Sequence, residues 1–332
     1  MKIKIPKKIL MALDYLIIFD PISLIFVLLI TLAGYGSQQM VVAGNPPWWV
    51  TAFNIQNLLF FTAIFLISGS IFILNQNNHY YQKSRKNKLS PIEKGDVDGK
   101  IAKKIAVIAM IVGLAIMLLF QKLFLVGVAL IIVILRGFLH NLLNINKKDK
   151  GGLWIFSNLI FASLLFLFGW LIKGAISPEI VVYYLPYLAQ SVSFLILVFL
   201  LDSNMLYKSY KNGEEIIHMG DRKFLIWLAG LMAVIAFALG LRNNDPLISH
   251  SMLLALVLYI ILIFKVNHLW IVRTISYSAL FFVFFISSQF PWFFLFAVIA
   301  YYLAKKYYHD RFDLIFPNFG NIEELEENDV NN

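Results

Sequence analysis

Long apolar segments, separated by short polar connections, run through almost the whole chain. About twenty apolar residues are enough for a helix to cross the hydrocarbon core of a bilayer. The pattern predicts an all-α fold class, namely a polytopic transmembrane helical bundle of nine or ten helices. The number is left open because the connections between the last four segments are short, so that one of these segments could be a half-helix. The expected segments are 15–35, 52–75, 102–120, 123–141, 153–172, 180–202, 223–241, 247–265, 269–287 and 290–306.

The composition excludes several other classes of protein. Of the 332 residues, 60% are hydrophobic and 14% charged, and the mean hydropathy is +0.76, so a soluble domain would have too little polar surface. The chain has no cysteine, which excludes disulfides, iron–sulfur clusters and thiolate zinc sites. The net charge of +9 could suggest binding to nucleic acid, but the basic residues are placed along the chain as the topology of a membrane protein requires. We therefore expect the lipid bilayer, and no nucleic acid, as a partner.

The basic residues predict the orientation of the chain. With the N-terminus in the cytoplasm, 23 of the 28 Lys and Arg residues lie in cytoplasmic segments, three lie in outside loops and two lie inside helices. Such a bias is typical of membrane proteins, whose cytoplasmic loops are enriched in basic residues. We expect both termini in the cytoplasm, a single transmembrane domain over residues 1–310, and an acidic, disordered cytoplasmic tail over residues 311–332.

Two apolar segments are followed directly by runs of polar residues on the expected cytoplasmic side. The second expected helix reaches Asn75, is followed by four more polar residues, and leads into a basic run. The sixth ends at Asp202 and leads into a second basic loop with an Asn212-Gly213 turn. Ordinary helix ends would explain either stretch alone. Their regular spacing, four helices apart, favours two halves that face one cavity.

Charges inside apolar segments are costly and are functional candidates by default. Arg136 lies four residues before His140, so the two share a face of the fourth expected helix. Arg136 either contacts a polar head group or pairs with Asp20 or Asp202, and the sequence leaves both open. Arg273 lies near a helix end, where its side chain can reach the interface.

These residues resemble the motifs of the UbiA superfamily of membrane prenyltransferases. The family's first motif is N-D-x-x-D-x-x-x-D followed by P-[IL]-x-x-G, and its counterparts here are Asn75, then Pro91, Ile92 and Gly95. The second motif is an Asp series leading to a basic-x-Gly turn, and its counterparts are Asp202 and then Lys211-Asn212-Gly213. The resemblance covers residues 15 to 290 and implies the UbiA fold.

Most of the motif carboxylates are replaced in this chain. The three Asp positions of the first motif hold Gln76, His79 and Lys83. The later Asp positions of the second motif hold Met205 and Ser209. The family uses these carboxylates to hold Mg²⁺, so Mg²⁺ is the cofactor that the resemblance implies. Mg²⁺ prefers hard oxygen ligands, and a single Asp beside amides and a Lys is a poor site, so we assign no metal ligand.

The resemblance implies transfer of an isoprenoid chain from a prenyl diphosphate to an aromatic or other lipid-pathway acceptor. Asp202 is the candidate catalytic residue, because it can orient a Lys or accept a proton. The candidate substrate-binding residues are Asn75, Asn78, His79, Lys83, Arg85, Arg136, Lys208 and Lys211. Basic residues at these positions would take over part of the diphosphate binding that Mg²⁺ performs.

Two other interpretations stay open at this point. The first is a non-catalytic UbiA-fold protein that binds an isoprenoid or lipid, or supports a membrane complex, because relaxed selection on metal binding leaves such Asp losses. The second is an unrelated transporter, for which Arg136 is the sole midplane charge that the sequence offers.

Overall fold

The structure is a computed structural model that describes residues 13–43, 55–81, 92, 97–139, 151–202, 208–211, 214–217, 220–266 and 268–312. A short helical segment at residues 13–17 precedes the main helices. The helices are α2 (Pro21–Ala43), α3 (Ile55–Tyr81), α5 (Gly99–Leu119), α6 (Leu123–Ile132), the π-helix η1 (Val133–Leu139), α8 (Gly151–Leu171), α9 (Glu179–Asp202), α10 (Gly220–Arg242), α11 (Pro246–Phe264), α12 (His268–Gln289) and α13 (Pro291–Phe312). The strands are β1 (Lys208–Lys211) and β2 (Glu214–Ile217).

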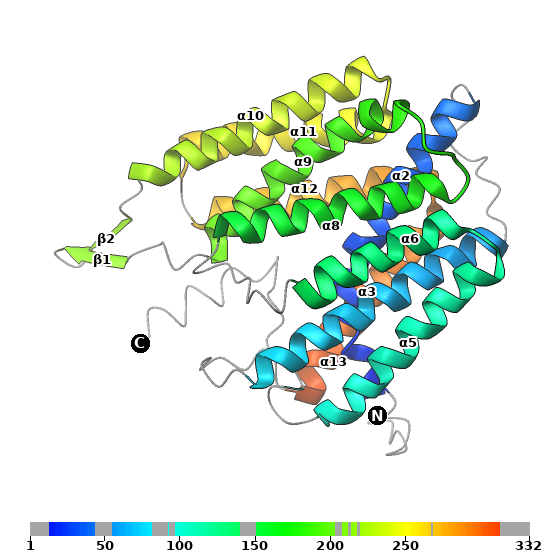
Figure 1. Cartoon of the computed structure of the whole chain (residues 1–332). Coiled ribbons are helices and arrows are strands. Elements are labelled where there is room, and N and C mark those ends of the chain that lie inside the picture. Colours follow the sequence, from blue (N-terminus) through cyan, green and yellow to red (C-terminus); the bar gives the residue numbers. More distant parts are fainter. Residues whose placement is uncertain are drawn as a thin grey trace.

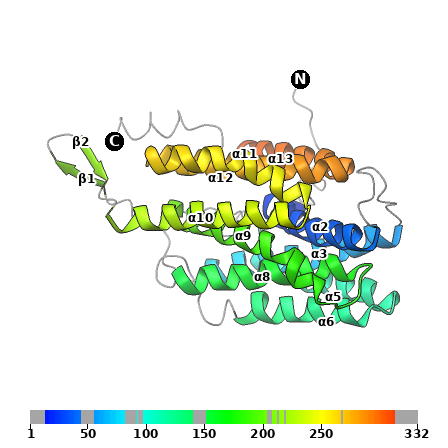
Figure 2. The same cartoon turned by 90° about the horizontal axis from the view of Figure 1, so that it is seen from above.

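The helices run side by side and form a bundle (Figures 1 and 2). Helices that follow each other in the chain pack together, as α9, α10, α11 and α12 do. One extensive contact joins distant parts of the chain, because α2 packs along α8. In the apolar span of α2, 72% of the residues are buried, and α2 also contacts α3, α9, α12 and α13. It is the central helix, around which one continuous hydrophobic core forms.

The structure confirms the predicted fold class. Eight helices in the described part of the chain are long and apolar enough to cross a membrane. Two further helices have shorter apolar stretches, at Leu123–Phe138 and Pro291–Tyr302. Each of the ten expected segments therefore contains a helix, and the fourth continues from α6 into η1. None of the last four described helices is a half-helix, since α10, α11, α12 and α13 have 23, 19, 22 and 22 residues.

The predicted bounds of the first helix, 15–35, are wrong at both ends. The backbone breaks at Asp20, which has a positive φ of 56°, and α2 begins at Pro21. Ser23 donates from its backbone N and its Oγ to the Asp20 carboxylate, at 3.2 and 2.6 Å. Proline is favoured at the first helical position and aspartate before it. The Asp-Pro pair was therefore a start signal, and α2 runs on to Ala43.

Both polar stretches contain more regular structure than the sequence suggested. The polar residues after Asn75 continue α3 for six residues, to Tyr81, where a helix end at 75 was expected. The expected basic loop after α9 contains an antiparallel hairpin in which Lys211 pairs with Glu214. Two residues separate these partners, as an Asn-Gly turn requires. Residues 212–213 themselves lie outside the described residues.

Candidate ligand cavity

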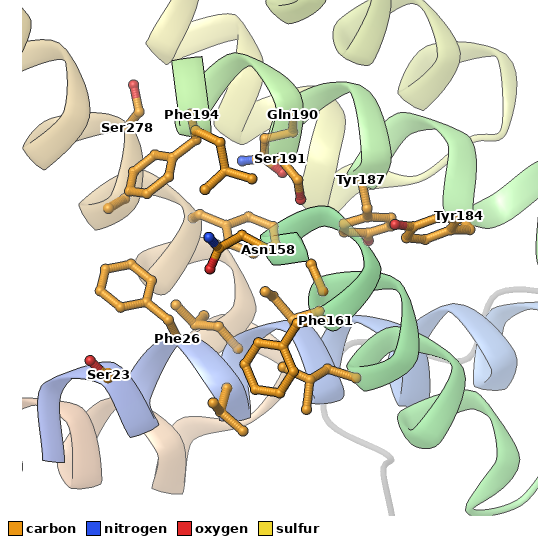
Figure 3. Close-up of a pocket in the computed structure, with 18 of the residues that line it drawn as sticks. Ser23, Phe26, Asn158, Phe161, Tyr184, Tyr187, Gln190, Ser191, Phe194 and Ser278 are labelled. Atoms are coloured by element: carbon orange, nitrogen blue, oxygen red, sulfur yellow. The ribbon is translucent and has the colours of Figure 1, made fainter. Parts of the chain in front are cut away.

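A cavity of about 270 Å³ lies in the centre of the bundle (Figure 3). Its walls come from α2, α3, η1, α8, α9, α11 and α12, so it requires the whole bundle and not one pair of helices. The aromatic wall residues are Phe26, Phe72, Phe161, Phe194, Phe282, Tyr184, Tyr187 and Tyr259. The other polar wall residues are Ser23, Arg136, Asn158, Gln190, Ser191 and Ser278. An apolar cavity with a few polar groups is typical of a site for an organic ligand.

Arg136 is the only charged residue among the described residues that line the cavity. It is carried by η1, and single turns of π-helix often occur at functional sites. Its Nη1 lies 3.5 Å from Ser157 Oγ, and its guanidinium carbon lies 5.6 Å from the centre of the Phe161 ring. Contacts of this kind hold the guanidinium at the wall, where it would attract an anionic group of a ligand.

Three tyrosines of the cavity wall are held from behind by hydrogen bonds. The Tyr184 hydroxyl lies 2.5 Å from Ser163 Oγ, and the Tyr259 hydroxyl lies 2.6 Å from Ser193 Oγ. Tyr187 Oη donates to Asp245 Oδ2 at 2.7 Å. None of the three was predicted as a site residue, because the sequence around a tyrosine in an apolar segment does not indicate which face of the helix it will occupy. These bonds satisfy the hydroxyl groups of three residues that line the cavity, so their rings can be buried there.

Asp245, the partner of Tyr187, is fully buried just before α11. Its Oδ1 accepts from the backbone N–H groups of Leu247 and Ile248, at 3.0 and 3.4 Å, which caps the helix. Burial raises the pKa of the Asp245 carboxyl above its usual range, although the hydrogen bonds from Tyr187 and the backbone act in the opposite direction. Tyr187 in the cavity wall is therefore linked to the start of α11 through Asp245, whose carboxyl group is costly to ionise.

The bundle is similar to the solved structure of a digeranylgeranylglyceryl phosphate synthase in membranes. The two share 19% sequence identity with a TM-score of 0.56, and the match covers 87% of this chain and 99% of that one. The chain has the fold of a UbiA-type membrane prenyltransferase. No model of a known protein family matches the sequence, and no curated protein is significantly similar to it.

Within this UbiA-type fold, the predicted site residues are described to different extents. Arg136 lines the cavity, whereas the partly buried Asn75 on α3 is not among the lining residues. Asn78, His79, Lys208, Lys211 and Asp202 belong to described helices or strands, but their side chains lie outside the described residues. Lys83 and Arg85 lie outside the described residues altogether. Their grouping around one site stays a prediction.

The described residues do not fit the Mg²⁺ that a UbiA-type enzyme uses. None of them form a group of three carboxylate, imidazole or thiol side chains, and no carboxylate is among those that line the cavity. Gln76, which occupies the first motif Asp position, donates from Nε2 to the Ile18 carbonyl at 3.2 Å. This amide holds the turn before α2 to α3. The position that the resemblance aligns with a motif Asp therefore contacts the backbone before α2 in this chain.

Proposed function

We propose that the chain is a divergent UbiA-type prenyltransferase that binds a prenyl diphosphate and transfers its isoprenoid chain to a lipid-pathway acceptor. The observation that carries the proposal is the apolar, aromatic-walled cavity in a UbiA-type fold, with Arg136 at its wall. The cavity suits an isoprenoid chain because its walls are mostly apolar. Arg136 suits the anionic end of such a ligand, because charged hydrogen bonds to phosphate are strong.

The proposed transfer needs no oxidant or reductant. The bond between the allylic carbon and the diphosphate oxygen breaks, and the diphosphate leaves with the electron pair. The allylic carbon then bonds to the acceptor, which loses a proton. Aromatic faces such as those of Phe26 and Phe194, whose ring centres lie 6.0 Å apart, stabilise a cation and exclude water. We propose Asp202 as the residue that receives the proton or orients a Lys.

The charge on the leaving diphosphate must be neutralised for the transfer to proceed. In this proposal Arg136 acts together with the basic residues that follow α3 and α9, namely Lys83, Arg85, Lys208 and Lys211. Asn75, Asn78 and His79 contribute hydrogen bonds at the same cytoplasmic mouth. No step is assigned to Mg²⁺.

Binding of geranylgeranyl diphosphate to the full chain in nanodiscs tests the Arg136 assignment. Arg136→Gln should weaken binding at least tenfold, because a charge-assisted hydrogen bond contributes about 1.5–3 kcal/mol. Arg273→Gln is the matched control, since Arg273 stacks 5.1 Å from the Trp270 ring centre and does not line the cavity. Equal affinities for both variants and wild type would remove Arg136 from the site.

The same assay tests the basic loops and the metal. Lys83→Ala combined with Lys208→Ala should weaken binding at least tenfold, and more at low salt, where charges are less screened. A chelator should leave the affinity of the wild type unchanged. A large loss of affinity on chelation would show that carboxylates elsewhere hold Mg²⁺.

The second candidate function is a non-catalytic protein that holds an isoprenoid or lipid or supports a membrane complex. It is favoured by the lack of carboxylates among the described residues that line the cavity. Radiolabelled geranylgeranyl diphosphate added with a total lipid extract separates the two functions. An enzyme releases inorganic diphosphate and labels a lipid product. Tight binding without release of diphosphate would favour the non-catalytic function.

A further inference from the structure

Two cations contact the same indole ring at the connection between α11 and α12. The Lys265 Nζ lies 6.0 Å from the centre of the Trp270 ring, and the guanidinium carbon of Arg273 lies 5.1 Å from it. Both distances are within the range at which a cation is attracted to an aromatic face. Lys265 is the C-cap of α11, whereas Trp270 and Arg273 belong to the first turns of α12. The ring therefore gathers charges from the ends of two helices, and we call the three residues the Trp270 cluster.

The two charges of the Trp270 cluster are not balanced by a carboxylate in the described part of the chain. Among the residues that the structure describes, neither the Lys265 nor the Arg273 side chain has an ion-pair or hydrogen-bond partner. The sequence has no Asp or Glu between Asp245 and Asp310. Two like charges held at one ring repel each other, and an anion placed between them replaces that repulsion with two attractions. The cluster is therefore suited to an anionic group from outside the chain.

The Trp270 cluster lies between two apolar spans, at the level expected for lipid head groups. The span of α11 ends at Phe264, directly before Lys265, and the span of α12 begins at Trp270. Phe264 is 83% exposed, so its ring is accessible to lipid chains. Arg273 is three residues inside its span, but side chains on a helix lean toward the N-terminus, which directs this guanidinium back to the boundary. Tryptophan and basic residues are typical of this depth in membrane proteins.

The surroundings of the cluster favour a lipid phosphate over a free phosphate ion. Lys265 is exposed and Arg273 is half-buried, so water competes with a free ion for both side chains. The phosphate of a phospholipid is already held at this depth by its chains, so its local concentration is high. The charge of the head group decides among lipids, because the choline of phosphatidylcholine would bring a third cation to the cluster, whereas phosphatidylglycerol is anionic.

We propose that Lys265 and Arg273 bind the phosphate group of an anionic phospholipid such as phosphatidylglycerol, with Trp270 as the surface that holds both cations in place. In the orientation that the basic loops predict, this lipid lies in the cytoplasmic leaflet. It bridges the end of α11 and the start of α12, two helices that line the central cavity through Tyr259 and Phe282. The bound lipid therefore stabilises the packing of these helices. The site does not depend on the proposed prenyl transfer.

Native mass spectrometry of the full chain in detergent, titrated with dioleoyl phosphatidylglycerol or dioleoyl phosphatidylcholine, tests the site. The wild type should bind the first phosphatidylglycerol molecule about tenfold more tightly than phosphatidylcholine, because two charge-assisted hydrogen bonds hold the anionic lipid. Lys265→Gln combined with Arg273→Gln should abolish this preference, since both charges are lost. Lys265→Arg combined with Arg273→Lys keeps both charges and should retain the preference, which separates loss of charge from loss of folding.

Lys103→Gln combined with Lys104→Gln is the matched control. These two lysines are exposed near the start of α5, on the same predicted side of the membrane, and neither contacts an aromatic ring within the described ranges. This variant loses the same charge and should keep the preference for phosphatidylglycerol. Equal loss of the preference in both glutamine pairs would show a general effect of surface charge and would overturn the proposal. A wild type without any preference would overturn it as well.

Thermal unfolding of the delipidated chain in detergent distinguishes the two sources of phosphate. Phosphatidylglycerol should raise the melting temperature of the wild type, because a ligand that binds only the folded state stabilises it, and should not raise that of the Lys265→Gln, Arg273→Gln variant. Inorganic phosphate at millimolar concentration should leave the melting temperature of the wild type unchanged. An equal rise with inorganic phosphate would show a site for the free ion and would overturn the assignment to a lipid.

Discussion

Asp245 is a buried carboxyl whose ionisation is costly, and this gives the stability of the protein a specific pH dependence. Its pKa in the folded state is raised by burial, so the folded state holds a proton that the unfolded state releases above about pH 4. The stability of the wild type should therefore fall as pH rises from about 4 through the raised pKa, by up to about 1.4 kcal/mol per pH unit. Asp245→Asn cannot ionise and should lack this fall. Thermal unfolding followed by tryptophan fluorescence measures it.

Asp98 supplies the matched control at the scale of one residue. It caps α5 by accepting from Lys100 N at 2.8 Å, but it is exposed. Asp98→Asn should change the stability little, because asparagine caps a helix about as well as aspartate does. A wild-type stability that rises with pH from about 4 upward, together with an Asp245→Asn variant that lacks the rise, would show that Asp245 folds ionised.

At the scale of elements, the contact between α2 and α8 depends on two glycines. A Cβ at Gly34 would overlap the Phe166 carbonyl oxygen, and a Cβ at Gly169 would overlap the Thr31 carbonyl oxygen. Backbone atoms cannot rotate away as a side chain can, so Gly34→Ala should force the two helices apart. We expect a destabilisation of about 1–3 kcal/mol and a lower melting temperature.

Gly127→Ala on α6 is the control for this helix contact, because nothing lies within 4 Å of the Cβ it would add. It should be neutral, or stabilising by up to about 1 kcal/mol, since alanine favours helix more than glycine does. If Gly34→Ala melts at the wild-type temperature or above, α2 and α8 do not pack closely. The cavity that they help to line would then differ in shape.

At the scale of the whole molecule, the orientation in the membrane that the basic loops predict can be tested directly. The chain has no cysteine, so each introduced cysteine is the sole thiol. Ala175→Cys, at an exposed position between α8 and α9, should react with an impermeant maleimide in intact cells. Ser209→Cys in β1 should react only after the membrane is permeabilised. The opposite labelling pattern would place both termini outside.

The apolar helices and the fold class followed from the sequence, because a segment of about twenty apolar residues can cross hydrocarbon only as a structure that satisfies its own backbone polar groups, which a helix does. Arg136 was found for a related reason, since a charge within such a segment is costly enough to need a role. The start of α2 was also encoded, in Asp20-Pro21, although the apolar pattern alone placed it too early. These signals are local, and each is readable in one segment.

The tertiary structure decided which faces meet. Ser278, Ser287 and Ser276 are equivalent in the sequence, yet one lines the cavity, one lies in the core away from it, and one bonds its own helix. Tyr184 and Tyr187 became cavity walls because Ser163 and Asp245, distant in the chain, hold their hydroxyls. A helix that is apolar on nearly all sides has little amphipathic pattern, so its sequence does not indicate which of its faces will line a cavity. By itself the sequence thus determined the helices and their fold class, whereas the cavity arose from the packing of α2, α8, α9 and α12, which no single segment specifies.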